Sequence, residues 1–170
     1  MTNNLVLTVI GDDKPGLVES LADVIAENSG NWLESSMSQL AGKFAGILRV
    51  SVADESADKL IAELNKLPDN LKLVIEKVNV DEFIAEPRTM NLNLVGNDRP
   101  GIIRDISRVL AGRAVNVEEL NTSCSAAPMS GETLFKGKAV VKIPVELDID
   151  ELQLELERLA DDLIVEIELE

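Results

Sequence analysis

The stretch GDDKPG at residues 11–16 recurs, with two changes, as GNDRPG at residues 96–101. Each copy follows an apolar run typical of a strand and precedes an apolar stripe typical of a helix. The interval of about 85 residues is half of the 170-residue chain, and it also relates Asn31 to Asn116. We therefore predict two similar domains, at 1–82 and 89–170, joined by a linker at 83–88.

Periodicity predicts the same order of elements in both halves, strand, helix, strand, strand, helix, strand. This order predicts an α+β fold of two ferredoxin-like βαββαβ domains, each a four-stranded antiparallel sheet with two helices on one face. In domain 1 we predict strands at 5–10, 31–40, 43–52 and 71–80, a helix from 17 to about 28 with Pro15 in its first turn, and a helix at 56–67 capped by Ser56. In domain 2 we predict strands at 90–94, 115–123, 133–145 and 164–170, helices at 102–110 and 150–160, and an insertion at 124–132.

Composition argues against several classes of function. The chain has 16 basic and 31 acidic residues and a net charge of −15, so direct binding to nucleic acid is not expected. It has no His, which removes imidazole acid-base catalysis, His-containing triads and imidazole metal ligands. We expect no enzymatic activity, no cofactor and no metal site.

The sequence also indicates where the protein works. No apolar run approaches the ~20 residues that span a bilayer, and the N-terminus lacks the basic region of a signal peptide. A single Cys leaves no intramolecular disulfide to form. We expect a cytoplasmic protein without membrane association. Two small sheets can bury further surface by pairing through their edges or their helix faces, and we expect a homo-oligomer.

The repeated turn has a chemistry of its own. A helix N-terminus presents unpaired backbone N–H groups and a partial positive charge, so the turn before it can hold an anionic group such as a carboxylate. Gly16 and Gly101 lack a Cβ and would let a ligand approach the backbone. A glycine-bounded turn before a helix can equally be no more than a turn.

The Asp-Lys/Arg-Pro-Gly motif at the first helix of each half, with an Asn fifteen residues past its last Gly, resembles the ACT domain, a small-molecule sensing module that often binds amino acids. The sequences GNDRPGII at 96–103 and NWLESS at 31–36, together with an Ala-Pro-Met loop at 127–129, are similar to the family of glycine cleavage system transcriptional repressors. That resemblance implies a regulator that responds to glycine and antagonises a LysR-type activator without binding DNA alone.

The resemblance also implies the ligand site, which would lie between the strand-helix turn of one domain and a neighbouring domain. The turn backbone and an Asn at the start of the second strand would contact the ligand. The matching residues are Gly11, Asp12, Asp13, Gly16 and Asn31 in domain 1 and Gly96, Asn97, Asp98, Gly101 and Asn116 in domain 2. An Asn amide can donate to a carboxylate and accept from an ammonium, although either Asn could instead cap the preceding helix or make a turn.

The motif departs from the serine-binding version of the ACT domain at two positions in each copy. Gly11 and Gly96 stand where that version has His, and Asp13 and Asp98 where it has Asn. An ionised Asp repels a carboxylate, so it would hold the ligand's ammonium or simply cap the helix. The sequence leaves both interpretations open.

We carry three functional hypotheses from the sequence. The first is an amino-acid sensor that acts through contact with a transcription activator, and the second is a free-standing regulatory subunit of an amino-acid metabolic enzyme. The third, catalysis by the chain itself, is disfavoured because no nucleophile-base pair or metal constellation is visible. The effector, the number of occupied sites and the direction of its effect stay open.

Overall fold

The structure is a computed structural model that describes residues 2–68, 70–78, 87–128 and 131–169. The chain divides into two compact units, Met1–Glu82 and Phe83–Glu170, called domain 1 and domain 2 below. Most of the expected linker at 83–88 lies outside the described residues. The elements of domain 1 are β1 (Thr2–Asp12), α1 (Leu17–Glu27), β2 (Asn31–Leu40), β3 (Lys43–Ala53), α2 (Asp54–Leu64) and β4 (Leu71–Val78). Those of domain 2 are β5 (Arg88–Asn97), α3 (Ile102–Gly112), β6 (Asn116–Ala126), β7 (Thr133–Ile143), α4 (Ile149–Glu157) and β8 (Ile164–Leu169).

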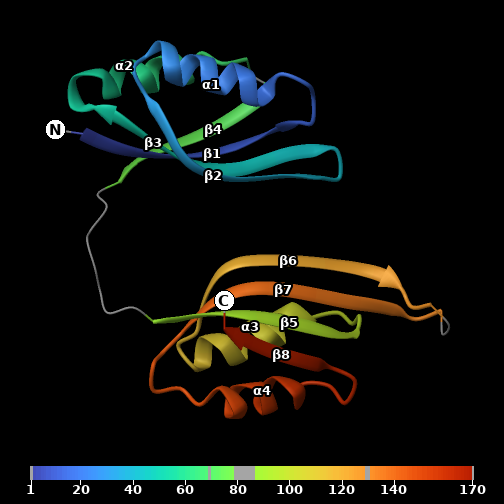
Figure 1. Cartoon of the computed structure of the whole chain (residues 1–170). Coiled ribbons are helices and arrows are strands. Elements are labelled where there is room, and N and C mark those ends of the chain that lie inside the picture. Colours follow the sequence, from blue (N-terminus) through green and yellow to red (C-terminus); the bar gives the residue numbers. More distant parts are fainter. Residues whose placement is uncertain (1, 69, 79–86, 129–130, 170) are drawn as a thin grey trace. The chain divides into compact units, whose positions relative to one another are not determined.

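Each domain is one antiparallel sheet with its two helices on one face (Figure 1). The strand order is β2-β3-β1-β4 in domain 1 and β6-β7-β5-β8 in domain 2, so the first strand of each repeat is a central one. The register pairs Leu7 of β1 with Leu48 of β3 and Leu92 of β5 with Ala139 of β7. The predicted ferredoxin-like arrangement is confirmed in both halves.

The alternation of the central strands builds the two cores. Leu5, Leu7 and Val9 are buried under α1 and α2, where Leu21, Ile25, Leu60 and Leu64 complete a separate cluster. Met90, Leu92 and Leu94 take the same positions in domain 2. Since a strand points successive side chains to opposite faces, the residues between them lie on the face without helices, which we call the open face.

Several element boundaries differ from the sequence expectations. Helix α2 begins at Asp54 after Ala53, so Ser56 lies inside the helix and does not cap it. Pro15 precedes Gly16, the N-cap of α1, and is not in the first helical turn. The first three residues of the expected insertion at 124–132 are strand, because 124–126 continue β6 and pair with 133–135. Among the described residues, no helix is both long and apolar enough to cross a membrane.

The core of domain 1 makes a quantitative prediction. Leu60 is fully buried, so Leu60→Ala should lower the free energy of unfolding of domain 1 by about 2–5 kcal/mol, measured by urea denaturation. Leu40 is 78% exposed and serves as the matched control. Leu40→Ala should change the free energy of unfolding by less than about 0.5 kcal/mol, and equal effects of the two variants would contradict this assignment of the core.

Candidate functional site

The turn of domain 1 is anchored to the sheet at its start. Strand β1 ends at Asp12, whose carboxylate accepts a hydrogen bond from the Lys43 ammonium, and this interaction lowers the pKa of Asp12. The Asp13 N–H donates to Gly42 O over 3.0 Å. Gly16 then takes a left-handed conformation, with φ of +91°, as the N-cap of α1. A residue with a side chain would be strained at this position.

Helix α1 begins without a side-chain cap. The prediction that Asp13 could cap this helix is therefore wrong, because the backbone at Gly16 turns the chain into the helix three residues later. Within the described residues, the N–H groups of Leu17, Val18 and Glu19 have no hydrogen-bond acceptor. A cavity of about 240 Å³ lies against them, lined by Asp13, Lys14, Gly16, Leu17, Val18, Glu19 and Phe44. Backbone donors, the Lys14 ammonium and the carboxylates of Asp13 and Glu19 thus border the same space.

The turn of domain 2 has the same backbone and a different surrounding. Gly101, with φ of +88°, is the N-cap of α3, again without a side-chain cap, so Asp98 does not cap its helix either. Arg99 and Arg104 converge on Asp105, at 2.8 and 3.1 Å, and their hydrogen bonds lower its pKa. A Cβ at Gly101 would lie only 3.0 Å from Arg104 Nη2. The domain's own arginines therefore lie over this helix start.

Other groups tie the domain 2 turn to its neighbours. The Asn97 N–H donates to the Asp162 carboxylate, and the Asp98 N–H donates to Thr133 O over 2.8 Å.

Burial and the nearby Asp98 carboxylate raise the pKa of the Cys124 thiol, so this thiol is not an activated nucleophile. The described residues contain no group of three or more Cys, Asp or Glu side chains placed to hold a metal.

The structure does not bring Asn31 and Asn116 to the turns of their own domains. Asn31 is the first residue of β2 and pairs with Ser51, which pairs with Asn4 near the start of β1. Eight residues of β1 separate Asn4 from Asp12, about 26 Å at ~3.3 Å per residue. Asn116 pairs with Lys142 at the equivalent end of domain 2. Neither Asn caps a helix, since the C-caps are Asn28 and Arg113.

Gly11 has a structural reason for its lack of a side chain. A Cβ at this position would lie 2.7 Å from the backbone oxygen of Asn70, far inside contact distance. The His of the serine-binding version would therefore clash with the 70–71 segment in this chain. Gly96 is less tightly enclosed, because a Cβ at this position would lie 3.1 Å from a side-chain atom of Leu163. The first Gly of the domain 1 motif thus serves packing.

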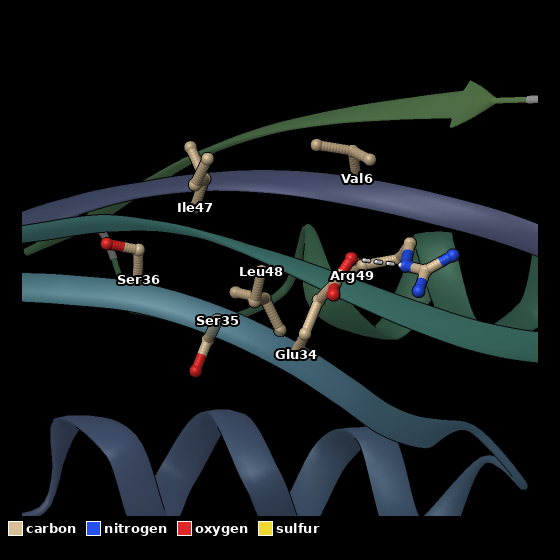
Figure 2. A pocket seen from close by; sticks show the side chains of 7 residues that line it. All are labelled: Val6, Glu34, Ser35, Ser36, Ile47, Leu48 and Arg49. Atoms are coloured by element: carbon tan, nitrogen blue, oxygen red, sulfur yellow. Dashed lines mark ion pairs between the residues drawn. The ribbon is translucent and has the colours of Figure 1, made fainter. Parts of the chain in front are cut away.

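Sequence reasoning missed a hollow on the open face of domain 1. It has a volume of about 280 Å³ and is lined by Val6, Glu34, Ser35, Ser36, Ile47, Leu48 and Arg49. Figure 2 shows Val6 and Ile47 pointing away from the helices and the ion pair between Glu34 and Arg49, whose Nε lies 2.7 Å from Oε1. This contact is an ion pair with poor hydrogen-bond geometry, because Arg49 Nε has no acceptor in line. The sequence signal for this hollow was Val6, an apolar residue that alternates with the buried residues of β1 and therefore lies on the open face.

The family follows from sequence comparison. A protein-family model for the ACT domain matches residues 3–77. A UPF0237 protein of Methanopyrus kandleri is 41% identical over 85 residues, which are 49% of this chain and 94% of that protein. The chain belongs to the ACT-domain family. The second ACT domain follows from the repeat and from the shared strand order.

Solved structures match the tandem arrangement as a whole. An unknown protein from Galdieria sulphuraria is 25% identical, with a TM-score of 0.88, covering 100% of this chain and 99% of that one. A candidate glycine cleavage system transcriptional repressor is 16% identical, with a TM-score of 0.74 and the same coverage. The ACT fold is a regulatory one, and at this identity the second likeness concerns the fold alone.

The close approach at Gly11 is testable. Gly11→Ala should lower the free energy of unfolding of domain 1 by about 1–3 kcal/mol, because the backbone at Asn70 must move. Gly112→Ala is the control, since nothing lies within 4 Å of its Cβ position in α3. That control should be neutral or stabilising by up to about 1 kcal/mol. Urea denaturation measures both, and a neutral Gly11→Ala would contradict the packing role.

Proposed function

We propose that this protein is an amino-acid-responsive regulator whose output is a contact with another protein. The observation that carries the proposal is the start of α1, where the N–H groups of 17–19 and the Asp13 carboxylate border one cavity. The helix N-terminus suits the carboxylate of an amino acid, and Asp13 suits its ammonium. A zwitterion would satisfy both, whereas a simple anion would meet the repulsion of Asp13.

The complete site uses two domains. Because Asn31 lies about 26 Å from the turn of its own domain, the amide that closes a site over turn 11–16 comes from a second copy of the chain. A ligand held in this way stabilises one arrangement of two domains over others. A partner that distinguishes these arrangements then responds to the ligand, with a coupling of about 1–3 kcal/mol.

Glycine is the first effector to test, and a LysR-type activator is the first partner. Glycine is the amino acid with no side chain beyond the zwitterion, and the candidate repressor that shares the fold is named for the glycine cleavage system. The net charge of −15 favours action through protein contact, in the cytoplasm, over direct DNA binding. The functional domains are 1–82 and 89–170, with residues 83–88 between them.

Calorimetric titration with glycine, L-serine and L-alanine tests the sensor. We expect binding at millimolar concentration or better, and Asp13→Ala should weaken it about tenfold because the ammonium loses its partner. Asp23→Ala removes the same charge from an exposed position within α1 and should leave the affinity unchanged. Binding by none of the three amino acids would contradict the proposal.

A pull-down from native cell extract, with and without glycine, tests the partner class. We expect a LysR-type activator whose recovery changes with glycine. Recovery of an amino-acid metabolic enzyme instead would favour the alternative, a free-standing regulatory subunit. The Asp13→Ala variant is the control, because it should retain the partner and lose the response to glycine.

A further inference from the structure

The open face of domain 2 carries a hollow of about 330 Å³ that lies away from both of its helices. It is lined by Asn91, Asn93, Glu119, Asn121, Lys138, Ala139, Val140 and Glu168. All four strands of the sheet contribute lining residues, so the hollow lies across the middle of the sheet. Three amides, one ammonium and two carboxylates surround it.

The register places these groups in two adjacent rows. Lys138 pairs with Asn121 of β6 on one side and with Asn93 of β5 on the other. In the next row, Asn91 pairs with Glu168 of β8. Side chains that face each other across paired strands lie about 5 Å apart at Cβ. One ammonium is thus flanked by two amides, with carboxylates at the edges of the array.

The amides and the ammonium have no partners of their own. Over the described parts of the chain, the side chains of Asn91, Asn93, Asn121 and Lys138 make no hydrogen bond or ion pair. Asn91 and Asn93 are half-buried, and their side chains line the hollow. On the same strand Lys142 is paired with Glu118 at 2.7 Å. The polar side chains of the hollow therefore keep free donors and acceptors, whereas Lys142 on the same strand is paired.

The same hollow exists in domain 1 with different chemistry. The repeat equates Asn91 with Val6, Asn93 with Thr8 and Asn121 with Ser36, and the strand register equates Lys138 with Ile47. In both domains a β-bulge in the second strand lies directly before the lining glutamate, at Trp32/Glu34 and at Val117/Glu119. Bulges bend a strand and re-aim its side chains, and they are common beside functional sites. Both domains therefore have this hollow because they share the fold, and the hollow of domain 2 has the polar lining.

We propose that this hollow is a second ligand site, which binds a small zwitterionic metabolite of the amino-acid class. Lys138, Asn93 and Asn121 hold the carboxylate, and Glu168, which pairs with Asn91, holds the ammonium. Four residues of β5, about 13 Å, separate Asn93 from the turn at Asn97, so the site is distinct from the turn. The inference stands independently of the proposed function, since it uses other residues in the other domain.

Backbone and side-chain amide spectra of the ¹⁵N-labelled full chain, titrated with glycine, L-serine and L-asparagine, test this site. We expect shifts in the side-chain NH₂ signals of Asn91, Asn93 and Asn121 with at least one of these probes. Asn93→Thr and Lys138→Ile install the residues that domain 1 carries, so they preserve the sheet. Each should weaken the affinity read from these signals about tenfold. Lys136→Ala, on the same strand and face outside the hollow, should leave it unchanged.

Two outcomes would overturn the inference. One is the absence of shifts at these asparagines with all three probes while the spectrum shows a folded domain 2. The other is an affinity at these signals that neither Asn93→Thr nor Lys138→Ile changes. Shifts at the amides of 17–19 report on the turn of domain 1 separately. If the amides of 17–19 do not shift while binding at Asn93 is retained, the result would contradict the proposed function and support the second site.

Discussion

The antiparallel register of the central strands β1 and β5 fixes the positions of the two turns and of Asn31 and Asn116. Each central strand ends at the turn that precedes the first helix of its domain. The pairing of that strand places the start of the second strand at the opposite end of the sheet. The turn and the Asn of one domain therefore lie too far apart to contact one small ligand. Under the proposed function a second copy of the chain supplies the Asn, and ligand binding then favours one arrangement of the copies.

The fold was predictable because its signals are periodic. Leu5, Leu7 and Val9 alternate, and Leu21 and Ile25 recur at helical spacing, in a pattern that the chain repeats. The site was less predictable. Gly16 and Asn31 are fifteen residues apart, yet α1 carries the chain back along the sheet between them, so proximity in sequence becomes distance in space. The caps were misjudged for a related reason: a left-handed Gly16 starts the helix without Asp13, and this depends on a backbone angle that composition does not reveal.

The two copies agree in their backbone and differ in the side chains at their turns and open faces. Both keep the left-handed glycine, the strand order and the bulge in the second strand. The turn of domain 1 borders an open cavity, whereas Arg99 and Arg104 lie over the start of α3. On the open faces the contrast is reversed: Val6 and Ile47 make domain 1 apolar, and Asn91 and Lys138 make domain 2 polar. Each domain thus offers a different kind of surface to ligands and partners.

The central proposal is that one amino-acid site joins the turn of domain 1 to an asparagine of a second copy of the chain. The most direct measurement is an amide-resolved glycine titration of the full chain that follows the backbone N–H groups of 17–19 and the side chains of Asn31 and Asn116 together. The account predicts that the turn and one of the asparagines shift with a single dissociation constant. Shifts confined to the turn, or turn and asparagine signals with different dissociation constants, would contradict it.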